Sequence, residues 1–311
     1  MGPITLAPHV ISPIWAGTRL AQIRGLEPSG DKNYGESFDI SAHEGVTSQV
    51  ASGPGKGMAY DEFLRAYHDE VLGDTEDTES LQAIFMDAKE FLSVQVHPGE
   101  EDAARLVGDR GKVECWYICE AEPGAELIGG CTTCDLEALR EASANDTIGE
   151  RYGLRVPVHP GDFVQVPSGT MHAMGPGILS VEIGSFGNTT FRLCDWGRGR
   201  ELHVDQGFEV LNPSNCVTVA HVGDPERVDH PATHRAIHNE AFTCDVIDVR
   251  DSWQVPTDGR YFLLTCVWGE AHVSSPEGDT NLAYTESCVI PASLEGVTIS
   301  GDCRVVVSRR C

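Results

Sequence analysis

The sequence predicts a mainly β protein made of two β-barrel domains, with a few helices inserted in the first. Short runs of strand-forming residues alternate with turns, and the 311 residues include 33 glycines and 17 prolines. Many short strands separated by such turns are typical of a β-sandwich or a small barrel. Hydrophobic residues make up 41% of the chain, which is enough for a substantial core.

The first part of the chain contains both kinds of element. Apolar residues at helical spacing predict a helix over 59–73, and similar patterns recur near 135–144 and 203–212. Strand-like runs cover 36–41, 91–97, 112–120, 125–130, 156–167, 178–185 and 189–196. The run NPSN at 212–215 divides an N-terminal domain, residues 1–212, from a C-terminal domain, residues 213–311, which contains only strand and turn patterns.

The net charge of −26, from 22 basic and 48 acidic residues, argues against nucleic acids and anionic membranes as partners. No apolar run approaches the roughly 18 residues of a membrane span. The first residues, MGPITLAPHVIS, lack the basic residues of a signal peptide. We therefore expect a cytoplasmic protein, either a monomer or a weak homodimer.

Eleven cysteines, an odd number scattered along a long chain, indicate reduced thiols rather than a disulfide framework. Cys131 and Cys134 form a single C-x₂-C pair without a second pair or nearby histidines, which is weak evidence for zinc. Thr133 and Asp135 are instead typical of residues that cap the helix following them.

The most informative motif is GDFVQVPSGTMH at 161–172, which has the pattern G-x₅-P-x-G-x₂-H of the second cupin motif. Pro167 and Gly169 favour a tight turn after a strand. In a jelly-roll barrel such a turn directs His172 into a small interior that suits a metal and a compact ligand.

Upstream residues supply candidate partners for His172. Gln95 and His97 lie two apart and therefore point to the same face of a strand. Glu114 follows 17 residues after His97, which leaves room for a loop and a return strand. Taken singly, each residue is most often structural, but together they offer O, N, O and N donors, a set that suits Zn²⁺ with open positions.

Several segments together resemble type I phosphomannose isomerase, in its short bacterial form within the cupin superfamily. These are DAKEFLSVQVHP (87–98), KVECWYICEAEPGAELIGG (112–130), PVHPGDFVQVPSGTMHAMGPGILSVEIG (157–184) and TTFRLCDWGR (189–198). The resemblance implies cupin barrels, of which the N-terminal one binds metal, and a zinc-dependent aldose–ketose isomerase. It also implies that mannose 6-phosphate and fructose 6-phosphate are interconverted.

The resemblance implies zinc ligands at Gln95, His97, Glu114 and His172, and catalytic or substrate roles for Lys112 and Arg192. Lys112 shares a strand face with Glu114, and we expect a nearby ion and Arg192 to lower its pKa into a range useful for acid–base chemistry.

Two further carboxylates are weaker candidates for the site. Glu36 is a candidate for binding a substrate hydroxyl, and Glu182 for orienting a metal ligand. For each of them an ordinary structural role in a strand is the alternative interpretation.

The chain departs from this family at one informative position. Relatives carry a lysine eleven residues before the glutamine ligand, where this chain has Ile84. The change leaves two alternatives open: isomerisation of a non-phosphorylated sugar, or sugar binding without turnover. A cupin dioxygenase that uses Fe²⁺ is a third possibility. Gln95 disfavours the last, since imidazole suits redox iron better. The turn at Pro291 has no histidine in the place of His172, so we expect one zinc ion per chain. The expected partner is a sugar or sugar phosphate.

Overall fold

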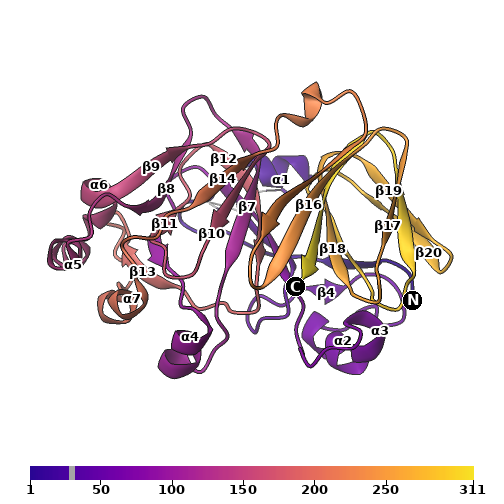
Figure 1. Ribbon diagram of the computed structural model, residues 1–311, viewed down its shortest axis with the longest axis horizontal. Helices are drawn as coiled ribbons and strands as arrows, with labels where there is room; N and C mark the ends of the chain where they lie inside the picture. Colours follow the sequence, from indigo (N-terminus) through magenta and orange to yellow (C-terminus); the bar gives the residue numbers. More distant parts are fainter. Residues whose placement is uncertain (28–31) are drawn as a thin grey trace.

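The computed structural model describes residues 1–27 and 32–311 and consists mainly of antiparallel strands in stacked layers (Figure 1). Four sheets lie one behind another, with α5 (Leu136–Ala144), α6 (Ile148–Tyr152) and α7 (Val204–Val210) on the outside of the five-stranded sheet (Figure 1). The predicted fold class, mainly β with few helices, is confirmed.

The first two sheets enclose the interior that holds the candidate site. The five-stranded sheet has the order β13-β6-β11-β8-β9, with bounds Phe191–Cys194, Val94–Val96, His172–Ala173, Glu126–Cys131 and Gly153–Pro157. The seven-stranded sheet has the order β14-β10-β7-β12-β5-β3-β2. Its bounds are Thr218–His221, Asp162–Val166, Glu114–Ala121, Ile178–Gly184, Gln82–Ala88, Glu36–Ile40 and His9–Ile11.

Strand alternation decides which side chains of β7 enter this interior. Trp116 and Ile118 join the apolar cluster between the two sheets, whereas Cys115 and Tyr117 join the cluster on the opposite face. Because successive residues point to opposite faces, Glu114 points inward with Trp116. The sheet therefore directs a carboxylate into an otherwise apolar barrel.

The other two sheets form the second half of the molecule. A seven-stranded sheet has the order β15-β16-β23-β18-β21-β1-β4, with bounds Ala232–His238, Phe242–Val249, Cys303–Arg310, Phe262–Gly269, Ser287–Ile290, Ile4–Ala7 and Gln49–Val50. A four-stranded sheet has the order β17-β22-β19-β20, with bounds Ser252–Pro256, Gly296–Ser300, Ala271–Ser275 and Gly278–Leu282. Strands β1 and β4, from the N-terminal end of the chain, thus complete a sheet built mostly from C-terminal strands.

The two seven-stranded sheets pack face to face through one large apolar cluster. Phe85 and Tyr117 contribute from the first sheet, and Phe242 and Val306 from the second. All four side chains are almost fully buried. Burial of this much apolar surface stabilises the sheets as one unit.

The helices are short and lie outside the barrels. Their bounds are Arg19–Ile23 (α1), Tyr60–Ala66 (α2), His68–Val71 (α3), Glu100–Val107 (α4), Leu136–Ala144 (α5), Ile148–Tyr152 (α6) and Val204–Val210 (α7), with a 3₁₀ turn at Pro225–Arg227. The Asp135 carboxylate accepts the N–H groups of Glu137 and Ala138, as the sequence predicts for a cap. Within 1–27 and 32–311, no helix has the length and apolar character needed to cross a bilayer.

Candidate functional site

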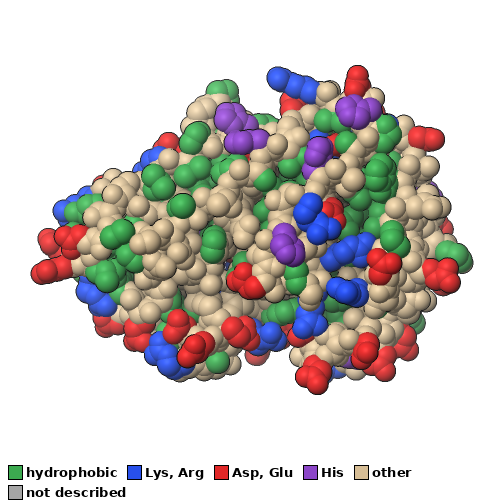
Figure 2. All heavy atoms as spheres, viewed as in Figure 1, with side chains coloured by type: hydrophobic (Ala, Val, Ile, Leu, Met, Phe, Trp, Pro, Cys, Tyr) green, Lys and Arg blue, Asp and Glu red, His purple; other side chains and the backbone are tan. Residues whose placement is uncertain are grey.

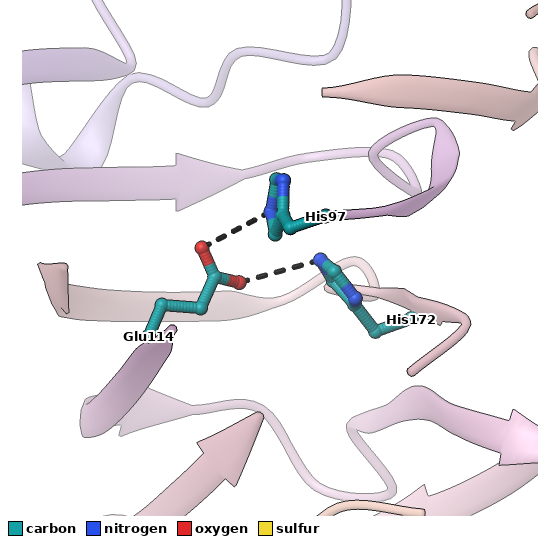
Figure 3. Close-up of side chains that lie close together, drawn as sticks. All are labelled: His97, Glu114 and His172. Atoms are coloured by element: carbon teal, nitrogen blue, oxygen red, sulfur yellow. Dashed lines mark ion pairs between the residues drawn. The ribbon is translucent and has the colours of Figure 1, made fainter. Parts of the chain in front are cut away.

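Three predicted ligands meet inside the first barrel (Figure 3). His97 follows β6, Glu114 begins β7 and His172 begins β11. Nε2 of His97 lies 3.2 Å from one oxygen of Glu114, and Nε2 of His172 lies 3.3 Å from the other. All three side chains are buried, with exposed fractions of 2%, 0% and 1%.

Backbone carbonyls fix the orientation of both imidazoles. Nδ1 of His97 lies 2.9 Å from the Thr189 carbonyl oxygen, and Nδ1 of His172 lies 2.8 Å from that of Thr170. A carbonyl accepts only, so Nδ1 of each ring carries a proton, which leaves Nε2, the atom that faces Glu114, as the possible metal ligand of each ring. Burial lowers the pKa of His172 to about 4, although Glu114 acts in the opposite direction.

This cluster of nitrogen and oxygen ligand atoms suits a metal ion. Nε2 of His97 and both oxygens of Glu114 are buried and have no hydrogen-bond partner in the part of the chain that the structure describes. The Lys112 ammonium lies 3.0 Å from one of these oxygens, and a divalent cation would satisfy the nitrogen and both oxygens at once. The three ligand atoms lie within 4.8 Å of one another, so little movement is needed to close on an ion.

Gln95 lies beside the cluster, as its spacing from His97 predicts. It is the cross-strand partner of His172, and its side-chain Nε2 is 3.3 Å from Nε2 of that histidine. A half-turn of the amide directs Oε1 toward the same point, which would add a fourth, neutral donor.

Lys112 is held between two carboxylates. Its Nζ lies 3.0 Å from Glu114 and 2.7 Å from Glu182. Burial by itself lowers the pKa of Lys112, but Glu114 and Glu182 outweigh it and hold the pKa above its ordinary value. The expectation of a lowered pKa is therefore wrong for the protein without an ion, because sequence inspection did not place Glu182 against this amine.

Glu36, on β3, lies close to the same group of charges. It alternates with Phe38, which belongs to the interior apolar cluster, so the Glu36 side chain also points into the barrel. Burial, and then the negative charge of Glu182, raise its pKa to about 7 against the attraction of Lys112 and Arg200. The side chain is partly exposed, unlike those of Glu114 and Glu182.

Arg192 lies in a group with Arg198 and Arg200, of which only Arg192 was predicted from the sequence. Nη1 of Arg192 donates to the Glu201 carbonyl at 2.8 Å, while its buried Nε has no acceptor within the described residues. The charges of Arg200 and Arg198 both act on it. Asp195 partly neutralises the group, with 2.6 Å to Arg200 and 3.4 Å to Arg198. The dense run DWGRGR was the available signal for these two additional arginines.

The guanidinium of Arg192 is not among the groups that contact the three ligands in the described structure; the backbone of Arg192 pairs with that of Gln95 instead.

Ile84 faces the interior of the barrel. It is the cross-strand partner of Phe38 on one side and of Glu182 on the other, and both of these side chains also point inward. This position on β5 therefore contributes an apolar surface to the barrel.

Comparison with known proteins agrees with this geometry. Residues 4–121 match the type I phosphomannose isomerase catalytic domain, and residues 232–310 match the mannose-6-phosphate isomerase cupin domain. A mannose-6-phosphate isomerase of Streptococcus mutans is 32% identical over 318 residues, covering 98% of each chain. Mannose-6-phosphate isomerase ManA of Bacillus subtilis is 32% identical over 314 residues, again covering 98% of each chain.

Solved structures show the same fold over the whole chain. The mannose 6-phosphate isomerase from Bacillus subtilis superposes with a TM-score of 0.87 at 29% identity, covering 99% of each chain. A putative mannosephosphate isomerase from Archaeoglobus fulgidus has a TM-score of 0.79 at 20% identity, covering 100% of this chain and 98% of the other. The chain therefore belongs to the type I mannose-6-phosphate isomerase family, whose members are cupin enzymes that interconvert an aldose and a ketose.

Proposed function

We propose that this enzyme interconverts mannose 6-phosphate and fructose 6-phosphate with one Zn²⁺ held by Gln95, His97, Glu114 and His172. The observation that carries the proposal is the pair of imidazoles whose Nε2 atoms converge on one buried carboxylate. Mixed N and O ligands with a position left open are typical of catalytic zinc. Full-length relatives named mannose-6-phosphate isomerase support the substrate.

The reaction removes the C2 proton of the aldose and returns a proton to C1, through an enediolate. A bound zinc ion supplies Lewis-acid polarisation of the sugar oxygens. Lys112, kept protonated by Glu114 and Glu182, donates to the oxygen on which negative charge develops. Its role is that of a fixed cation and proton donor rather than of a base.

Glu36 is the carboxylate best suited to carry the proton between the two carbons. Glu114 is occupied as a ligand, and Glu182 is bound to Lys112 at 2.7 Å. Glu36 is partly exposed within the barrel, and a pKa of about 7 lets it accept and return a proton near neutral pH.

The arginine group provides the binding site for the phosphate. Arg192, Arg198 and Arg200 place three positive charges in one region of a chain whose net charge is −26. Guanidinium groups bind phosphate oxygens through paired N–H donors. A strongly acidic protein needs such a local group, since its overall field repels anions.

Ile84 supports one alternative, an isomerase of a non-phosphorylated sugar, because this inward position provides no cation. Steady-state kinetics with mannose 6-phosphate, free mannose and free fructose distinguish the two. The proposal predicts a kcat/KM for mannose 6-phosphate that exceeds the value for either free sugar at least about a hundredfold, the effect of roughly 3 kcal/mol of binding energy to phosphate. A higher kcat/KM for a free sugar would contradict it, and no turnover of any of them would indicate a sugar-binding protein.

A further inference from the structure

The chain between two of the ligands, His97 and Glu114, folds into a helix and a return loop. Helix α4 begins three residues after His97 and ends at Gly108, whose φ of 69° reverses the chain. The Glu100 carboxylate at the start of the helix accepts the N–H of Gly111 at 2.8 Å, so the beginning of the helix and the end of the return loop are hydrogen-bonded to each other. The reversal brings Asp109 back beside the segment that follows β12.

Asp109 binds this neighbouring segment through its carboxylate. One oxygen accepts the Thr189 hydroxyl at 2.6 Å and the Asn188 N–H at 3.2 Å, and the other accepts the Arg110 N–H at 2.8 Å. Burial alone raises the pKa of Asp109, but these hydrogen bonds outweigh it and hold the pKa below its ordinary value. The group is therefore an anion at working pH, and its hydrogen bonds are of the stronger, charge-assisted kind.

Thr189 connects this anion to the metal site. Its hydroxyl donates to Asp109, and its backbone carbonyl accepts the Nδ1–H of His97 at 2.9 Å. Nδ1 also lies 3.4 Å from the Thr190 hydroxyl, which can either donate or accept. If the Thr189 carbonyl moved away, that hydroxyl would remain as a neighbour able to stabilise the other tautomer, in which Nε2 carries the proton.

The two histidines differ in how their carbonyl partners are held. His172 uses Thr170, two residues earlier in the same turn, and that turn is closed by a hydrogen bond from the Thr170 N–H to Pro167. His97 uses a carbonyl 92 residues away along the chain. A distant carbonyl needs a separate support to keep its position, whereas a carbonyl within a tight turn does not.

We propose that Asp109 is a positioning residue of the metal site: through Thr189 it holds His97 in the orientation and tautomer that present Nε2 to Glu114. The inference rests on the metal site proposed above. Partners that orient a histidine ligand in this way typically change metal affinity when they are removed.

The test compares two variants of Asp109 with a matched control. Asp109→Ala removes the acceptor, and Asp109→Asn keeps an oxygen that can accept from Thr189 and Asn188. Asp102→Ala is the control, because Asp102 lies on α4, between His97 and Asp109, and pairs only with the exposed Arg105 among the described residues. Thermal unfolding confirms that each variant is folded at the assay temperature.

The first measurement is the affinity for Zn²⁺, obtained by competition with a chromophoric chelator. Asp109→Ala is expected to weaken binding about 10- to 100-fold, and Asp109→Asn and Asp102→Ala to stay within about threefold of the wild type. Unchanged affinity in folded Asp109→Ala, or an equal loss in Asp102→Ala, would overturn the proposal.

The second measurement separates this inference from the proposed function. Nitrogen-15 NMR of metal-free protein labelled at histidine reports which ring nitrogen of His97 is protonated, with His97→Gln identifying its signals. The wild type is expected to show protonated Nδ1, and Asp109→Ala a mixture of the two tautomers. If the wild type bound no zinc, the proposed function would fail while this result still stood; an unchanged tautomer in Asp109→Ala would overturn the inference alone.

Discussion

At the scale of single residues, Lys112 allows two buried carboxylates to lie side by side. Its ammonium contacts Glu114 at 3.0 Å and Glu182 at 2.7 Å in a setting where all three groups are shielded from water. Lys112→Met should lower the free energy of unfolding of the metal-free protein by about 3–5 kcal/mol, because it leaves buried charge without a partner. Urea unfolding in the presence of a chelator measures this loss.

The double variant Lys112→Met/Glu182→Gln is the control for that experiment. It removes one of the two negative charges together with the cation, so part of the lost stability should return. A Lys112→Met protein as stable as the wild type would show that the ion pair does not hold these side chains together.

Glu36 leads to a prediction about pH. Its pKa is about 7 in the folded protein and 4.5 in an unperturbed chain, so between these values the folded state holds a proton that the unfolded state has released. Stability contributed by this group is therefore present below pH 4.5 and is lost as the pH rises toward about 7. A variant without the Glu36 carboxylate should not lose this stability as the pH rises.

The measurement is thermal unfolding of chelator-treated wild type and Glu36→Gln across this range. The melting temperature of the variant should rise relative to the wild type from pH 4.5 to about 7 and then keep a constant difference. Glu62→Gln, at an exposed helical position, is the matched control. A constant difference between Glu36→Gln and wild type at every pH would contradict the assigned environment of Glu36.

Several features of the site were predictable from the sequence, and others were not. The two-residue spacing of Gln95 and His97 and the turn before His172 are local patterns, and the structure brings these residues together. The raised pKa of Lys112 depends in part on its contact with Glu182. The orientation of His97 depends on the backbone carbonyl of Thr189. Those contacts join residues 70 or more positions apart, and no local periodicity reports such a contact.

At the scale of elements, one buried arginine joins the two seven-stranded sheets. Arg304 on β23 forms a bidentate ion pair with Asp248 on β16, with N···O distances of 2.7 and 2.9 Å. It also donates a hydrogen bond to the Tyr117 hydroxyl on β7 at 3.2 Å. Arg304→Met should cost about 3–5 kcal/mol, since Asp248 stays buried and charged. Tyr117→Phe should cost only about 1 kcal/mol, the value of one hydrogen bond.

Chemical denaturation of both variants tests this difference. Equal losses in the two would indicate that the contact between sheets, rather than the compensated charge, provides the stability. Both side chains are fully buried, so solvent screening does not complicate the comparison.

Strands were easier to predict than short helices. Strand-like runs indicated β6, β7 and β8, but α4 was not expected because its eight residues, EEDAARLV, carry only a narrow apolar face. Three acidic residues in its first turn and Gly108 at its end are the signals that identify such a helix. The pairing of β1 with β21 joins residues near the two ends of the chain, and local patterns contain no information about it.

At the scale of the whole molecule, the net charge of −26 is the dominant property. Figure 2 shows acidic side chains along the lower edge of one face, with lysine and arginine side chains between them. Mutual repulsion opposes the compact state, and the screening length falls from about 10 Å at 0.1 M salt to about 3 Å at 1 M. The melting temperature should therefore rise between these concentrations of KCl.

Differential scanning calorimetry in KCl measures this effect, and sucrose at matched osmolality is a control without screening. A melting temperature that stayed level or fell with KCl would show that repulsion between surface charges does not limit stability. The same field opposes an anionic substrate, so the KM for mannose 6-phosphate should respond to salt more than the KM of any neutral sugar.

We propose that one metal ion, held by His97, Glu114 and His172, is needed to isomerise mannose 6-phosphate. The most direct test adds Zn²⁺ in small steps to chelator-stripped protein and follows formation of fructose 6-phosphate. We expect negligible turnover without metal and activity that rises to a plateau at one ion per chain. Folded His172→Ala should show neither binding nor turnover. Full turnover by the stripped protein, or by His172→Ala, would contradict it.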